Sequence, residues 1–313
     1  MTYVYDRAEC TGLGDRVGIL MTLATLANLH DVQIAFEWCQ DPSQVFPRLH
    51  KHIPQWKGYD YDMPEFIGRF WPHHDKLTII ADNFTSHQRE SSYKVVWKNL
   101  AVPAEAGLHH VYTTAWKATQ IPDKPVLDAE NYKGHYRLVA LAVQKHALAH
   151  NHRDLGLTEL DYIVLHMRGP DNNTYQAFEG AHDPLSEMYC TRKVLKRLLK
   201  GVPQAHFRVV TNNAYWLDKH LQHPRLLVVV NATAYDDFAL LLGAKAIIQH
   251  ATYGWSAFSS VPAMIGQIPL ITTLKRHMQH HRLGWFENYG GIPDEFHDCG
   301  QIPDFVQKVK ARF

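Results

Sequence analysis

The second half of the chain alternates short apolar runs with amphipathic stretches that are long enough to form helices. Strands are expected at 162–166, 206–211, 226–230, 246–249 and 269–272, and helices at 184–200, 214–221, 235–242 and 254–265. Apolar strands that alternate with helices are typical of a parallel sheet covered on both faces. Ligands of such sheets bind at the carboxyl ends of the strands, so we expect the chemistry in the loops that follow them.

The first half of the chain opens with the same kind of pattern. An apolar run at 3–5 leads through a glycine-containing turn to a helix at 15–29 and a strand at 32–36, an order with which nucleotide-binding folds begin. Residues 40–75 are rich in Pro, Trp, Tyr and His and are expected to form loops. Further strands are expected at 77–81 and 93–97, and further helices at 135–149 and 304–312.

A polar stretch at 150–157 separates the two halves, and a chain of 313 residues suits two domains better than one. We therefore expect an α/β protein of two Rossmann-like domains, residues 1–152 and 153–313, whose parallel sheets face a cleft. The final helix, expected at 304–312, either stays with the second domain or crosses back to the first.

The composition argues against several classes of function. The formal net charge is +1, which gives no strong field for nucleic acid or an anionic membrane. The sequence shows no transmembrane stretch, and its first residues lack the basic and apolar regions of a secretory signal. The four cysteines are scattered along the chain and are not expected to form a disulfide framework. A reducing compartment is therefore expected, and the predicted location is cytoplasmic, with peripheral attachment to a membrane left open.

The first candidate site is a glycine-containing turn. Gly12 and Gly14 flank Leu13 between an expected strand and helix, where they let the backbone approach a phosphate or a sugar, and the helix N-terminus then offers N–H groups to an anion. A plainer interpretation is a tight turn with Asp15 as helix cap. The dinucleotide pattern GxGxxG requires a third glycine where Val17 stands, which weakens NAD binding, although Glu37 at the end of the next strand keeps it open.

Two further candidates follow strands of the second half. His166, Arg168 and Asp171 come at the end of one strand, where an arginine suits a diphosphate because its planar fork bonds two oxygens. Thr252 and Tyr253 follow another strand and open a helix, which would make a second phosphate site. The structural alternatives are an ordinary ion pair for the arginine, an N-cap for the threonine and core packing for the tyrosine.

Taken together, these segments resemble the fucosyltransferase superfamily with the GT-B fold, which includes α1,2-, α1,6- and protein O-fucosyltransferases. Residues 12–16 are similar to the family's G-[LF]-G-N-[QR] loop, with Asp15 in place of Asn. His166, Arg168 and Asp171 match its H-[VIL]-R-x-x-D motif, in which the arginine holds the β-phosphate of GDP.

Two later segments continue the resemblance. Residues 209–213 look like the family's A-T-D-[DE] segment, with Asn212 at an acidic position. In the stretch 235–253, Asp237 matches an acidic position and Thr252 a phosphate-binding hydroxyl. The resemblance implies that Asn212 and Asp237 recognise guanine or ribose.

The resemblance also suggests a catalytic base. Glu179 begins a segment similar to an E-x-A-x-x-P-[IL] run of α1,6-fucosyltransferases, in which the glutamate takes the proton of the acceptor hydroxyl. Asp171 and Asp183 are the next choices. The implied reaction is an inverting transfer of a sugar, fucose from GDP-fucose above all, to a glycan or other hydroxyl acceptor, as in polysaccharide biosynthesis. Residues 1–152 would bind the acceptor and 153–313 the nucleotide sugar.

No cofactor and no metal are expected, because arginine and helix N-termini can neutralise the diphosphate. Asp60-Tyr61-Asp62 fits the D-x-D pattern of metal-dependent glycosyltransferases but is interpreted as chance. His277, His280 and His281 share a helical face and are interpreted as a solvated basic surface. Two other functions stay open at this point: an NAD-dependent oxidoreductase, and a non-catalytic protein that binds a sugar nucleotide or glycan on the same fold.

Overall fold

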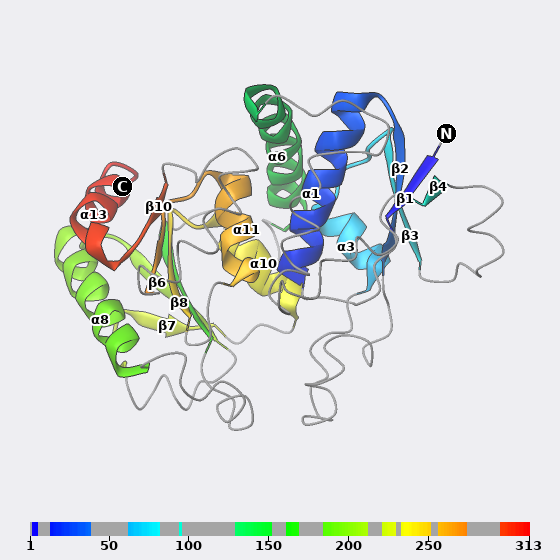
Figure 1. Cartoon of the computed structure of the whole chain (residues 1–313). Coiled ribbons are helices and arrows are strands. Elements are labelled where there is room, and N and C mark those ends of the chain that lie inside the picture. Colours follow the sequence, from blue (N-terminus) through cyan, green and yellow to red (C-terminus); the bar gives the residue numbers. More distant parts are fainter. Residues whose placement is uncertain are drawn as a thin grey trace. The chain divides into compact units, whose positions relative to one another are not determined.

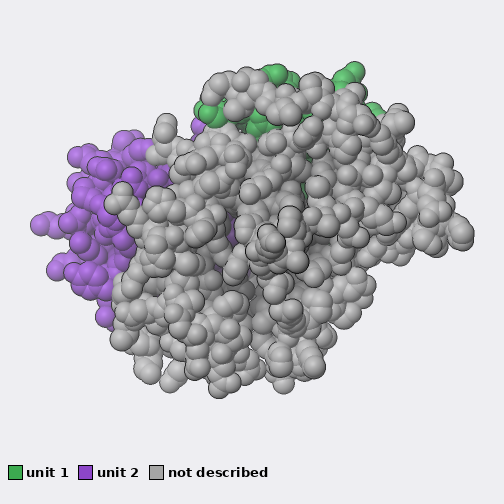
Figure 2. Space-filling view, viewed as in Figure 1, with its two compact units in different colours: residues 1–146, 284–291 green, residues 147–283, 292–313 purple. Residues whose placement is uncertain are grey.

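The computed structural model describes a large part of the chain in two compact units. The described residues are 2–5, 13–38, 62–81, 94–95, 129–151, 161–168, 184–211, 221–229, 233–251, 256–273 and 295–313. Unit 1 comprises residues 1–146 with 284–291, and unit 2 comprises residues 147–283 with 292–313 (Figure 2).

Unit 1 contains a four-stranded sheet with the order β3-β2-β1-β4, in which every pair is parallel (Figure 1). Its elements are β1 (Thr2–Tyr5), α1 (Leu13–His30), β2 (Gln33–Trp38), α3 (Met63–Phe70), β3 (Leu77–Ala81), β4 (Lys94–Val95) and most of α6 (Ala129–Asn151). Residues 16–27 of α1 are all buried, as is expected for a helix that is apolar around its whole circumference. The helix begins at Leu13, so Asp15 lies inside it and is not its cap.

Helix α3 corrects the expectation that residues 40–75 are loops throughout. The carboxylate of Asp62 accepts a hydrogen bond from the backbone N–H of Glu65 at 2.9 Å and caps the helix, and a proline follows in the first turn. Phe66 is buried and stacks on Trp38 with ring centroids 4.6 Å apart. The high aromatic and proline content concealed this start signal.

Unit 2 contains a six-stranded parallel sheet with the order β10-β9-β8-β5-β6-β7. Its elements are β5 (Tyr162–Arg168), α8 (Pro184–Gly201), β6 (His206–Thr211), β7 (Leu226–Val228), α10 (Ala234–Gly243), β8 (Ala246–Ala251), α11 (Ala257–Gly266), β9 (Leu270–Thr272), β10 (Phe296–His297), the 3-10 turn η2 (Cys299–Gln301) and α13 (Ile302–Lys310). The predicted fold class, α/β with two Rossmann-like parallel sheets, is confirmed.

The sheet of unit 2 is covered on both faces (Figure 1). Alternate residues of β5, such as Ile163, Leu165 and Met167, pack in one apolar cluster with α8 and α13. The residues between them, Tyr162 and Val164, pack in a second cluster with α10 and α11. This alternation follows from the pleat of a strand, which points successive side chains to opposite faces.

Several boundaries of unit 2 differ from the expected ones. Strand β5 continues to Arg168 and β8 to Ala251, because both strands pair along their whole length. Helix α11 begins at Ala257 instead of Gly254. The two-residue strand β10 was not expected, since so short a run carries no periodic signal. All four buried side chains of α13 belong to the core of unit 2.

A disulfide joins Cys190 on α8 to Cys299 in η2, with Cα atoms 6.2 Å apart. The expectation that the cysteines stay reduced is therefore wrong for this pair. The two residues are separated by 109 positions, and the packing of α13 beside α8 brings them together. Disulfides are typical of oxidising compartments, so this pair gives no support to the expected reducing one.

None of the described helices combines the length and the apolar character that crossing a bilayer requires.

Candidate functional site

The strand order of unit 2 has one point at which the direction of the chain reverses across the sheet. Strand β5 comes first in the unit, β6 and β7 extend the sheet on one side of it, and β8 to β10 extend it on the other. The carboxyl ends of β5 and β8 therefore mark the topological switch point, where doubly wound sheets bind their ligands. His166 pairs with Gln249 and Arg168 with Ala251 in this register.

A buried polar network lies at this switch point. Nδ1 of His166 and Oγ of Ser259 are 2.8 Å apart, and Nε2 of Gln249 donates to the same Oγ at 2.7 Å and to the carbonyl of Ser256 at 3.0 Å. His166 is 7% exposed and Gln249 is fully buried. No described residue donates to Oε1 of Gln249. Buried polar groups are costly unless they are bonded, so this network fixes the side chains at the switch point.

The N-terminus of α11 points to the same edge of the sheet. Ser256 holds the N-cap position, but no described side chain caps the helix. The backbone N–H groups of Ser259 and Ser260 bond to the carbonyl of Ser256 at 3.3 and 3.1 Å. A helix N-terminus carries partial positive charge and favours an anion. The N-cap of α11 is thus Ser256, four residues after the expected N-cap candidate Thr252.

Helix α10 also begins at this edge. Thr233 and Asp236 form a capping box, in which the Thr233 backbone donates to Oδ2 of Asp236 at 3.1 Å. Asp237, the residue predicted to contact guanine or ribose, is half-buried in the same first turn. The structure therefore gives Asp236 a capping role and brings Asp237 to the carboxyl edge of the sheet.

Unit 1 has an equivalent switch point between β1 and β4, beside the start of α1. Gly14 lies buried in the first turn of α1. Arg16 is 2% exposed, and its guanidinium carbon lies 4.8 Å from the centre of the Trp38 ring. Arg16 belongs to the glycine motif but was assigned no role from sequence, although an arginine is seldom fully buried unless it is paired.

Other predicted site residues lie outside the described part of the chain. They are Gly12, Asp171, Glu179, Asn212, Thr252 and Tyr253. For Asp15 and Arg168 the structure describes the backbone, in α1 and at the end of β5. The roles predicted for these residues stay predictions.

Sequence reasoning missed Ser259, which contacts His166, and also Gln249 and Ser256, which belong to the same network. The signals were a glutamine in an otherwise apolar strand and several serines at a helix start, but neither pattern names a partner. His250, the neighbour of Gln249, belongs to the other face, where its Nδ1 lies 2.8 Å from Oγ1 of Thr191. Burial lowers the pKa of His250 to about 4, so it is neutral at pH 7.

The described residues contain no group of three or more His, Cys, Asp or Glu that could hold a metal ion. In the D-x-D segment, Asp62 is used as the cap of α3.

Neither family models nor curated proteins match this sequence. Among solved structures, the E. coli heptosyltransferase WaaC with ADP is 11% identical and has a TM-score of 0.43, over 98% of this chain and 99% of that chain. A putative UDP-N-acetylglucosamine 2-epimerase from Listeria monocytogenes is 8% identical and has a TM-score of 0.39, over 99% of this chain and 89% of that chain. WaaG, a glycosyltransferase involved in lipopolysaccharide biosynthesis, is 8% identical and has a TM-score of 0.32, over 99% and 90%. Likeness at this level is distant and by itself assigns no function.

Proposed function

We propose that this protein is an inverting glycosyltransferase that binds a nucleoside diphosphate sugar, GDP-fucose in the first instance, at the switch point of unit 2. The observation that carries the proposal is the position of the H-x-R motif. His166 and Arg168 lie at the end of β5 beside β8, near the N-terminus of α11, which no described side chain caps. An arginine and a helix N-terminus together can neutralise a diphosphate without a metal.

The chemistry follows from these charges. The acceptor oxygen attacks the anomeric carbon, the bond from that carbon to the diphosphate oxygen breaks, and a carboxylate takes the acceptor proton. Negative charge grows on the diphosphate as it leaves, so a fixed cation at Arg168 would stabilise the transition state more than the ground state. Glu179 is the proposed base, with Asp171 and Asp183 as the alternatives.

The buried network gives the site its rigidity in this proposal. Ser259 and Gln249 hold His166 at the end of β5, two residues before Arg168. Asp237 and Asn212 follow neighbouring strands and are the proposed contacts to guanine or ribose. The acceptor is a glycan or another hydroxyl compound bound by unit 1.

A thermal-shift panel of GDP, UDP, ADP, CMP and NAD, first in EDTA and then with Mn²⁺, tests the donor. A ligand that binds only the native state raises the melting temperature. Stabilisation by GDP that is insensitive to EDTA is expected. Stabilisation by NAD alone would support the oxidoreductase, and stabilisation by UDP only with Mn²⁺ would contradict the proposed mode of binding.

Two variants and a control separate binding from catalysis. Arg168→Ala should weaken GDP binding about tenfold or more, because a charge-assisted contact is lost. Arg208→Ala is the matched control, since Arg208 stands over the Tyr162 ring on the neighbouring strand, away from the switch point. Glu179→Gln should keep GDP binding and lower turnover of GDP-fucose about a hundredfold or more. Full turnover in Glu179→Gln would show that another carboxylate acts as the base.

A further inference from the structure

From Tyr189 onward, the exposed charged positions of α8 are all cationic. The exposed positions that follow Tyr189 on this helix are Arg192, Lys193, Lys196, Arg197 and Lys200. At 3.6 residues per turn they fall within one arc of the helix, and Tyr189 lies near the middle of that arc. Tyr189 is 68% exposed, which makes it one of the most exposed large hydrophobic side chains among the described residues.

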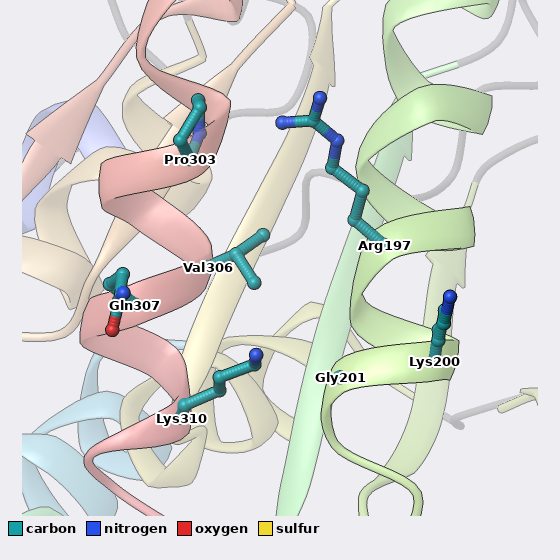
Figure 3. Close-up of a pocket in the computed structure, with 7 residues that line it drawn as sticks. All are labelled: Arg197, Lys200, Gly201, Pro303, Val306, Gln307 and Lys310. Carbon is teal, nitrogen blue, oxygen red and sulfur yellow. The ribbon is translucent and has the colours of Figure 1, made fainter.

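A groove beside this arc adds a further cation from α13. It has a volume of about 400 Å³ and lies between the C-terminal turns of α8 and the length of α13 (Figure 3). Its lining residues are Arg197, Lys200, Gly201, Pro303, Val306, Gln307 and Lys310. Three of the seven are cationic, and Pro303 and Val306 give the groove an apolar side.

Gly201 makes room for the third cation. A Cβ at this position would lie 2.7 Å from Cε of Lys310, closer than such atoms approach one another. The absence of a side chain lets Lys310 extend from α13 toward the end of α8 (Figure 3). The groove therefore presents Arg197, Lys200 and Lys310 from two helices.

Five of these six cations, all except Arg192, are not neutralised by described residues. No described carboxylate forms an ion pair with Lys193, Lys196, Arg197, Lys200 or Lys310. Glu295 lies 3.8 Å from Lys308 and 3.9 Å from Arg312 instead. Asp304 is exposed in the first turn of α13 but does not line the groove. A structural role alone would leave mixed charges on such a face, as protein surfaces usually have.

We propose that this cationic face, defined as the exposed positions 189–200 of α8 together with the α8–α13 groove, docks on an anionic membrane, with the groove taking a lipid phosphate. A basic helix face with an exposed aromatic residue suits the bilayer interface, where the ring rests among the headgroups and the cations meet anionic lipids. Each Lys or Arg near an anionic leaflet contributes about a fivefold gain in binding, so the five cations other than Arg192 suffice for reversible attachment. The inference concerns unit 2 alone and does not depend on glycosyl transfer.

Vesicle co-sedimentation of the full chain tests the proposal. Vesicles of phosphatidylcholine containing phosphatidylglycerol should bind the protein, vesicles of phosphatidylcholine alone should not, and added NaCl should release it. Equal binding to both vesicles, or binding to neither, would overturn the proposal. Binding to a single-stranded oligonucleotide in the absence of vesicle binding would overturn it in favour of nucleic acid.

Charge reversal locates the surface. The pair Arg197→Glu and Lys200→Glu should lower binding to the anionic vesicles about twenty-fivefold or more, by the loss of two cations. The matched control is Arg137→Glu with Lys145→Glu, which reverses two exposed cations of α6 in unit 1 and should change binding less than twofold. An equal loss in both pairs would show a non-specific effect of net charge and overturn the assignment. Lys193→Glu with Lys196→Glu, on the open side of α8, provides a second variant if the groove pair fails to fold.

Discussion

Nδ1 of His166 on β5 lies 2.8 Å from Oγ of Ser259 on α11, although 93 positions separate the two residues. The contact joins the C-terminal end of the central strand β5 to the first turn of α11, the helix that follows the neighbouring strand β8. It therefore joins the two elements that flank the switch point of unit 2.

Replacement of Ser259 by alanine should destabilise unit 2. The change removes the partner of Nδ1 of His166 and one of the two acceptors of Nε2 of Gln249, both in a buried site. A buried group left without a partner costs about 1–3 kcal/mol, which urea unfolding can measure. Ser260→Ala is the control, because Ser260 bonds only locally to the carbonyl of Ser256 and its loss should cost less. Equal losses in the two variants would contradict the importance of the network.

Because His250 is buried, we expect the free energy of unfolding to decrease in acid. Burial lowers the pKa of His250 from 6.5 to about 4, so the unfolded chain takes up the proton first as the pH falls. The free energy of unfolding that His250 contributes should therefore decrease between about pH 6.5 and 4, by up to about 3 kcal/mol. The difference in unfolding free energy between the wild type and His250→Asn, measured across this window, should change with pH. A constant difference would show that His250 does not titrate in this way.

The Cys190–Cys299 disulfide should stabilise unit 2 considerably. It closes a long loop, and loops of this length give about 2–4 kcal/mol in typical proteins. The double variant Cys190→Ala, Cys299→Ser should unfold at lower urea concentration and lose its sensitivity to dithiothreitol. Thiol titration of the unfolded wild type, with and without reductant, provides the independent check. If the unreduced wild type had two more free thiols than the double variant, the bond would not be formed.

Replacement of Arg225 should lower the free energy of unfolding of unit 2. Its guanidinium donates to the carbonyls of Leu199, Val202 and Ala205, at 3.0, 3.1 and 2.6 Å, and so holds the turn between α8 and β6. Arg225→Met keeps the stem and removes all three bonds, and we expect a loss of about 1–3 kcal/mol in urea unfolding. Arg208→Met removes a contact with the Tyr162 ring only and should cost less than about 1 kcal/mol.

Regular elements could be predicted from the sequence wherever their pattern was long and apolar. The strands of unit 2 were located within a few residues, because buried parallel strands have continuous apolar runs. Helix α3 and strand β10 were missed, the first because its capping residue is set among prolines and aromatics, the second because it is too short to show a period. Helix boundaries depend on caps, which explains the late start of α11.

Only those residues of the candidate site that lie on strand β5 could be predicted from the sequence. His166 and Arg168 stand out because polar residues at the end of an apolar run lie at a ligand edge. Gln249 and Ser259 could not be assigned as partners, because their contact depends on the register of β5 with β8 and on the packing of α11. Likewise, the net charge of +1 averages over the whole chain and conceals the cations gathered on α8.

The adjacency of β5 and β8 has a consequence for how the protein acquires its site. Ile163 pairs with Ala246, so the two central strands meet only after the whole intervening segment, with two strands and two described helices, has been synthesised and folded back. Such non-local pairing is slow, because chain entropy is lost before the contacts form. A nascent or truncated chain that ends before β8 would have the motif of β5 without the neighbouring strand, so the proposed nucleotide site would form late, as a signature of completed folding.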